Sequence, residues 1–147
     1  MEIELIVKKI IEINAERSKV WDAITNSELT KKYMYNNEVV SDWQKGSSIL
    51  WRDANNKTEH VKGIIKEIEP RKYLQTLDLS IDSGLPDIES NYSRVTYELK
   101  KENGKTLLSL TEDRFNGDEK RYKDAENFWN IILPKMKDLL EEHMFFK

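Results

Sequence analysis

Glu112 is the acidic residue whose spacing along the chain gives it the best prospect of acid–base chemistry. It follows Leu108 and Leu110 at two-residue intervals, so strict alternation along a strand would turn its carboxyl group toward the core. A carboxylate that is buried without a partner has a raised pKa and can act as an acid or a base. In the alternative interpretation, which we favour, the strand ends at Thr111 and Glu112 turns into solvent.

Glu67 and the two histidines are the other ionisable residues considered for a site. Glu67 stands in register with Gly63 and Ile65 and has the same two interpretations as Glu112. His60 lies on a predicted middle strand, where it faces either a cavity or water, and His143 falls in the last turn of the final helix, where positive charge is favourable. A metal would need further carboxylate ligands whose positions no motif indicates, so we predict no metal and no cofactor.

Covalent chemistry has little support in this chain. It contains no cysteine, which excludes disulfides, thiolate metal ligands and a cysteine nucleophile, and no local motif indicates a Ser-His-Asp triad. The segment 104–106 (Gly-Lys-Thr) is similar to the end of a phosphate-binding loop, but Leu99 occupies the position of the first glycine. A hairpin turn at Asn103 and Gly104 explains the same residues. We therefore lean toward a protein that is not an enzyme.

Aromatic residues are the stronger signal for a binding site. Several come from separate segments that the fold would bring around one space, with Tyr33 and Tyr35 near its mouth. Rings with polar tips suit a pocket for a flat or apolar ligand, whereas the alternative is a solid core filled by the same rings. Core packing is the favoured role of Leu77, Leu110 and Ile132. The complete set of ligand-binding candidates is Trp21, Tyr33, Trp51, Leu77, Tyr97, Leu110, Glu112, Phe128, Trp129 and Ile132.

The element that must position these residues is a long amphipathic helix over about residues 120–142. Its apolar residues recur at three- and four-residue spacing, as in Phe128, Ile132, Met136 and Leu139. Pro134 lies inside this pattern and predicts a kink, or alternatively a break in the helix. An apolar stripe of this width needs a sheet or other helices to cover it.

The preceding chain supplies that sheet. Period-two patterns and turn residues predict strands at 3–13, 39–40, 48–51, 58–69, 73–81, 92–100 and 106–112. Helical spacing predicts two short helices, at 15–25 and 27–35. Strands segregated from helices indicate an α+β fold. We therefore expect one domain, 1–147, in which a curved antiparallel sheet of about six to seven strands packs on the C-terminal helix around a pocket.

The composition and net charge of the chain limit the kinds of partner that it could bind. The chain is 38% hydrophobic and 35% charged, with a net charge of -3, so it has no basic surplus for nucleic acid. No apolar run approaches the roughly 18 residues that span a bilayer, so we expect no membrane insertion. The N-terminal residues lack the order of a signal peptide, and we expect a cytoplasmic protein.

The order of elements and several local segments resemble the START-like helix-grip (SRPBCC) superfamily. Within it, the chain is similar to the family named for the activator of the Hsp90 ATPase, in its small stand-alone form. The matching segments are 20–25, 46–51, 63–70, 95–99 and 108–111, with Phe128-Trp129, Ile132-Leu133-Pro134 and 137–141 in the final helix. The resemblance implies a curved sheet gripping a helix, often around an apolar cavity. It does not imply one activity, because the superfamily includes lipid carriers, hormone receptors and cyclases.

Three functions follow as hypotheses. The first is non-catalytic binding of a small hydrophobic or amphipathic ligand, with the 82–87 loop and the 29–35 helix as gates. The second is a protein-interaction module for a chaperone or another protein partner. The third is an enzyme acting on a hydrophobic substrate through Glu112 or His60. The protein would be a monomer or a homodimer, and the pair Phe145-Phe146 either joins a dimer interface or closes the final turn against the sheet.

Overall fold

The computed structural model describes the backbone of residues 4–145 and the side chains of residues 4–142. Seven strands and three α-helices follow the order that the sequence predicts. Their bounds are β1 (Val7–Ile13), α1 (Arg17–Thr25), α2 (Ser27–Tyr33), β2 (Asn37–Ser41), β3 (Ser48–Asp53), β4 (Glu59–Glu69), β5 (Tyr73–Ser80), β6 (Ser93–Glu102), β7 (Lys105–Asp113) and α3 (Glu119–Phe145). Two short 3-10 helices, η1 (Ile81–Ser83) and η2 (Glu89–Asn91), lie between β5 and β6.

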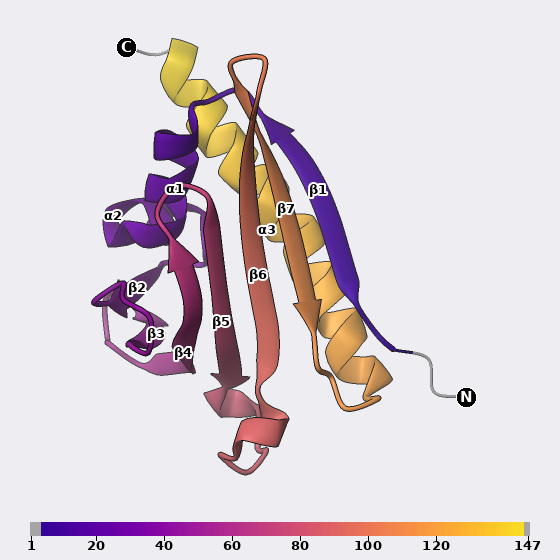
Figure 1. Ribbon diagram of the computed structural model, residues 1–147. Helices are drawn as coiled ribbons and strands as arrows, with labels where there is room; N and C mark the ends of the chain where they lie inside the picture. Colours follow the sequence, from indigo (N-terminus) through magenta and orange to yellow (C-terminus); the bar gives the residue numbers. More distant parts are fainter. Residues whose placement is uncertain (1–3, 146–147) are drawn as a thin grey trace.

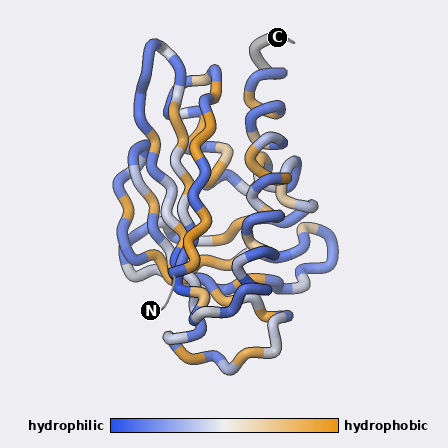
Figure 2. The backbone as a smooth tube through the Cα atoms, turned by 90° about the vertical axis from the view of Figure 1, so that its right-hand side faces the viewer, coloured by the Kyte–Doolittle hydropathy of each residue, from blue (hydrophilic) through white to orange (hydrophobic). Residues whose placement is uncertain are grey.

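The strands form one antiparallel sheet in the order β1-β7-β6-β5-β4-β3-β2. Neighbours in sequence pair as hairpins from β2 to β7, and β1 joins the far edge beside β7, so the first and last strands lie side by side. Asn103 and Gly104 make the β6–β7 turn with positive φ, as the hairpin interpretation requires. The helix α3 runs along one face of this curved sheet (Figure 1), and the edge-on view shows sheet and helix as two layers (Figure 2). The predicted α+β architecture is confirmed.

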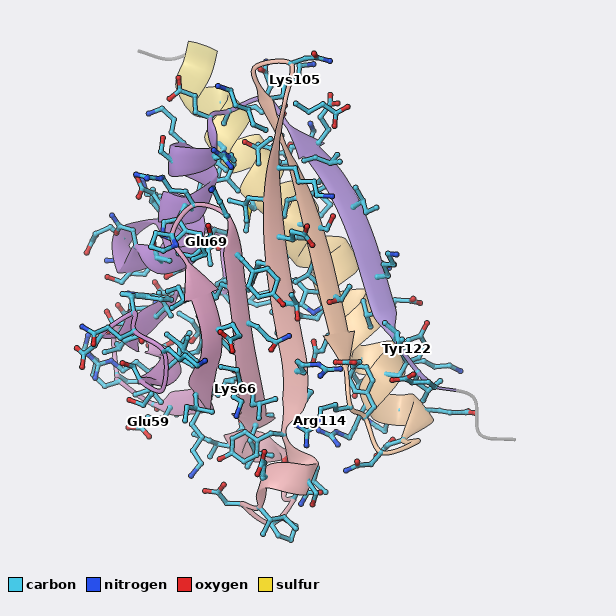
Figure 3. All side chains as sticks on the ribbon, in the orientation of Figure 1. Glu59, Lys66, Glu69, Lys105, Arg114 and Tyr122 are labelled. Atoms are coloured by element: carbon cyan, nitrogen blue, oxygen red, sulfur yellow. The ribbon has the colours of Figure 1, made fainter. Side chains whose placement is uncertain are left out.

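The core lies between the sheet and α3 because apolar residues alternate along the strands. In β7, Leu108 and Leu110 are fully buried, and in α3 Ile132 and Met136 are fully buried against the same space. The other face of the sheet, turned toward the viewer in Figure 3, carries many side chains that end in nitrogen or oxygen. The alternation therefore gives the sheet a core-facing side and a largely polar side.

The helix α3 continues without interruption through Pro134. The predicted alternative of a helix break is therefore wrong, while a bend at this residue stays a prediction. Pro134 and Asn130 are both exposed, so water can solvate the Asn130 carbonyl that loses its helical hydrogen bond. Within the described part of the chain, no helix has the combination of length and hydropathy needed to cross a bilayer.

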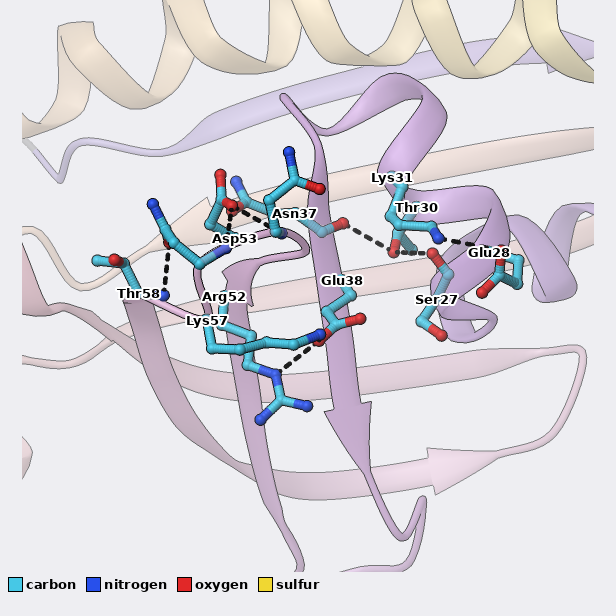
Figure 4. A network of polar contacts seen from close by, with 12 residues as sticks. Ser27, Glu28, Thr30, Lys31, Asn37, Glu38, Arg52, Asp53, Lys57 and Thr58 are labelled. Carbon is cyan, nitrogen blue, oxygen red and sulfur yellow. Dashed lines mark hydrogen bonds and ion pairs between the residues drawn. The ribbon is translucent and has the colours of Figure 1, made fainter.

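A polar network fixes the β2–β3 hairpin and ties it to α2 (Figure 4). The buried Thr30 hydroxyl donates to the Asn37 carbonyl oxygen at 3.1 Å. Glu38 Oε1 accepts bonds from Lys57 Nζ and Arg52 Nε, each at 2.7 Å. These bonds, led by that of Lys57, hold the pKa of Glu38 below its usual value. The network therefore holds the hairpin against α2.

Candidate functional site

A cavity of about 620 Å³ lies between the inner face of the sheet and the N-terminal half of α3. Its apolar wall is formed largely by aromatic side chains from three elements: Trp51, Tyr97, Phe128 and Trp129. The rings hold one another in place, with Trp129 edge-on to Tyr97 at 5.9 Å and to Phe128 at 5.0 Å between ring centroids. A volume of several hundred Å³ with mostly apolar walls is typical of small-molecule pockets.

The cavity is hollow because the inward positions of the central strands carry small or polar residues. Gly63, Asp78 and Ser93 are paired across β4, β5 and β6 and face the same space. A Cβ atom at Gly63 would stand 2.4 Å from Asp78 Oδ1 and 2.3 Å from the Leu77 carbonyl oxygen. Glycine at this position therefore makes the room that the Asp78 carboxyl group occupies.

Glu112 points into this cavity and is held by two donors. Trp129 Nε1 donates to Oε1 at 2.8 Å, and the Ser93 hydroxyl donates to Oε2 at 2.8 Å. Burial raises the pKa of the Glu112 carboxyl, and the two hydrogen bonds oppose that rise. The favoured expectation that the strand ends at Thr111 is wrong, because β7 pairs on both sides through Glu112, with Val7 and Val95, and so keeps its alternation.

Asp78 is the second carboxyl group of the cavity, and it was not among the predicted site residues. Burial raises its pKa to about 7, the charge of Glu112 adds to the rise, and the Thr76 hydroxyl opposes it. Its Oδ1 atom is buried and has no hydrogen-bond partner among the described residues. Because the charge of Glu112 acts on Asp78 and no described ion pair supplies a basic partner to either carboxyl group, the state in which both are ionised is disfavoured.

The leucines on either side of Asp78 are the reason that the sequence pattern did not indicate it as an inward residue. The alternation of Leu77 and Leu79 indicated an inward apolar face for this strand, but β5 has the opposite orientation. Leu77 pairs with Ile64 and Arg94 on the other side of the sheet, although it is itself buried. The signal that could have located Asp78 is its pairing with Ser93, which stands in register with the inward Val95 and Tyr97.

The ten candidate residues separate into three groups. Five line the cavity together: Trp51, Tyr97, Glu112, Phe128 and Trp129. Four belong to the packed core or its border outside the cavity: Trp21, Tyr33, Leu110 and Ile132. Tyr33 is buried and its hydroxyl donates to the Ala23 carbonyl oxygen at 2.5 Å, so it does not border the mouth, and Leu77 lies on the opposite face of the sheet.

The remaining ionisable candidates lie at the edges of the site or away from it. His60 is at the cavity mouth, with Nδ1 3.2 Å from Asp82 Oδ2. Glu67 is exposed and pairs with Lys45 at 3.0 Å, because an irregularity between Ile65 and Glu67 shifts the register of β4. The side chain of His143 and the pair Phe145-Phe146 lie outside the described side chains. Among the described residues, no group of three or more histidines and acids could hold a metal ion.

Comparison with known proteins agrees with this geometry. ChR145 from Cytophaga hutchinsonii, known from a solution structure, is 38% identical over 98% of this chain and 99% of its own, with a TM-score of 0.80. The Aha1 dimer from Colwellia psychrerythraea has a TM-score of 0.75 at 20% identity, over 92% of this chain and 96% of that one. CalU16 from Micromonospora echinospora has a TM-score of 0.72 at 19% identity, over 95% and 78%. The last two show a shared fold.

No curated protein matches the chain. The sequence pattern of one family, described as activator of Hsp90 ATPase homolog 1-like protein, matches residues 14–141 and so covers most of the chain, from the end of β1 to the last turns of α3. The resemblance predicted from local segments is therefore confirmed. The chain belongs to the family of activator of Hsp90 ATPase homolog 1-like proteins, with a START-like helix-grip fold.

Proposed function

We propose that this protein binds a small amphipathic molecule in the cavity between α3 and the sheet, without changing it chemically. The observation that carries the proposal is the combination of an aromatic wall with polar groups at the inner surface of the same cavity. The wall would remove the apolar body of a ligand from water, and the polar groups would orient one end of it.

Two segments that border the cavity could act as its gates. Asp82 and Ser83 of η1 are exposed lining residues, and Met34, just after α2, lines the cavity as a buried residue. These segments overlap the two expected gates. The loop after η1 is tied to the sheet by an ion pair between Lys62 and Asp87. Opening through this loop would require that contact to break or to move with the loop.

The proposal can be tested with an adjacent pair of substitutions. Val95→Phe would fill the cavity from β6, whereas Thr96→Phe places the same ring on the other face of the same strand. We expect native mass spectrometry of gently purified wild type and Thr96→Phe to show a bound mass that is lost on denaturation, and 1-anilinonaphthalene to bind both. Val95→Phe should lose both signals. Wild-type protein with no bound mass and no dye binding would refute the proposal.

An enzyme is the second candidate, because Glu112 lies inside the cavity as that hypothesis required. Its raised pKa, together with that of Asp78, would allow a proton to pass between a carboxyl group and a bound substrate. Mass analysis of ligands before and after incubation distinguishes the candidates. Recovery of an unchanged ligand supports binding alone, and conversion that Glu112→Gln abolishes supports the enzyme.

A further inference from the structure

The interior of the cavity offers hydrogen-bond acceptors that lack donors. Among the described residues, two buried side-chain oxygens have no hydrogen-bond partner, Asn37 Oδ1 and Asp78 Oδ1. Both residues line the cavity, and Glu112 adds a carboxyl group to the same lining. Buried acceptors without donors are unfavourable, so the site is suited to a ligand that donates several hydrogen bonds.

The same interior is short of positive charge. No basic side chain in the described part of the protein forms an ion pair with Asp78 or Glu112. The cations near the mouth have other contacts: Lys120 pairs with Asp124 at 2.8 Å, and Arg121 donates to the Asn91 carbonyl oxygen at 2.8 Å. The charge of Arg121 lowers the pKa of Glu112, but this effect is smaller than that of burial.

From these acceptors and this charge deficit we propose that the ligand is a small lipophilic amine, whose ammonium group bonds to Asp78 and Glu112. This inference rests on the proposed function and names its ligand class. The apolar body would lie against the rings of Trp51, Phe128 and Trp129. Aromatic faces also attract cations, which favours an ammonium over a neutral polar end. A metal ion fits less well, because no group of three ligating acids or histidines exists in the described residues.

Binding of such a cation must be coupled to a proton. Below about pH 7, the site holds a proton on Asp78, and the ammonium would replace it and release it to the buffer. Affinity should therefore rise from about pH 5 to about pH 8 and then level off. The other titratable groups facing the cavity are Glu112 of β7, Tyr97 of β6, His60 of β4, Asp82 of η1, and Lys120, Arg121 and Asp124 of α3.

Three probes with one apolar body test the inference: 4-phenylbutylamine, 4-phenylbutanol and 4-phenylbutyrate, titrated calorimetrically near pH 7.5. We expect the amine to bind at least about tenfold more tightly than the alcohol, and the acid to bind most weakly. Asp78→Asn and Glu112→Gln should each remove most of the amine's advantage while leaving the alcohol within about threefold. Glu98→Gln, a change of a half-buried residue on the other face of β6, is the control and should alter none of the affinities.

The protons released on amine binding give a second test that can be made on the wild-type protein alone. In two buffers of different ionisation enthalpy near pH 6, amine binding to wild type should release protons, and alcohol binding should not. Equal affinity for amine and alcohol in the wild type, without proton release, would overturn the amine inference and leave the proposed function standing. Failure of all three probes to bind would overturn both.

Discussion

The two ends of the layer between the sheet and α3 differ although the same strands and the same helix build them. From the middle of α3 toward its C-terminus, Ile132 and Met136 belong to one core cluster with Leu108 and Leu110, and all four are fully buried. About one turn earlier, where the N-terminal half of α3 meets the sheet, Trp129 donates to Glu112 and lines the cavity. Nothing in the backbone architecture requires this difference. It arises from the size and polarity of the residues at alternate inward positions.

The packed end of this layer serves stability, whereas the cavity end carries groups that are suited to function. The packed end removes apolar surface from water and leaves little space, so its burial stabilises the fold. The cavity end buries two carboxyl groups with raised pKa values, and this opposes folding wherever they are ionised. Groups that are unfavourable for folding and are nevertheless placed around a cavity are typical of functional sites.

The largest difference should appear on truncation of one apolar residue at each end. Leu110→Ala in the packed end should lower the free energy of unfolding by about 3–5 kcal/mol, because it opens a new void. Val95→Ala at the cavity should lower it by about 1 kcal/mol, since the space beside it is already open. Urea unfolding of both variants measures this. Equal losses would show that the cavity is closed or filled in solution.

An intermediate effect should follow from replacing Asp78 with asparagine. The folded-state pKa of about 7 lies above the unfolded value of 3.8, so the folded protein binds more protons and loses stability as the pH rises between these values. Asp78→Asn removes this loss. The difference in the free energy of unfolding between the variant and wild type should therefore increase by about 2–3 kcal/mol, in favour of the variant, from pH 5 to pH 8.

Urea midpoints across that pH range, with Glu98→Gln as the control, measure the difference. A constant offset between Asp78→Asn and wild type at all pH values would mean that Asp78 does not titrate in this range, and would contradict the contrast between the two ends.

The smallest effect concerns the donor to Glu112. Trp129→Phe keeps an aromatic ring in the wall but removes the Nε1–H bond to Glu112, so the pKa of Glu112 should rise further. The loss of stability should be about 1 kcal/mol greater at high pH, where Glu112 is ionised and its carboxylate needs the donor, than at low pH, where it is protonated. Carboxyl ¹³C chemical shifts of Glu112 during a pH titration report the pKa directly, and an unchanged value would exclude this role of Trp129.

Much of the fold could be predicted because local patterns decided it. The spacing in residues 120–142 specified a long helix, and the strand and turn signals placed every strand in order, with ends displaced by a few residues. The site was predicted less well. Five of the ten candidates line the cavity, while Leu77 lies on the other face and Asp78 was absent from the set.

By itself, the sequence determined the kinds of element, their order, and the aromatic side chains available for a pocket, since these depend on composition and spacing. Only the tertiary structure decided the orientation of β5 and the fate of Glu112. The long connection 81–92 does not set the register between β5 and β6, and a shift of one residue exchanges Leu77 for Asp78 on the inner face. Likewise, Glu112 faces inward because β1 and β6 both pair with β7, a contact between segments far apart in the chain.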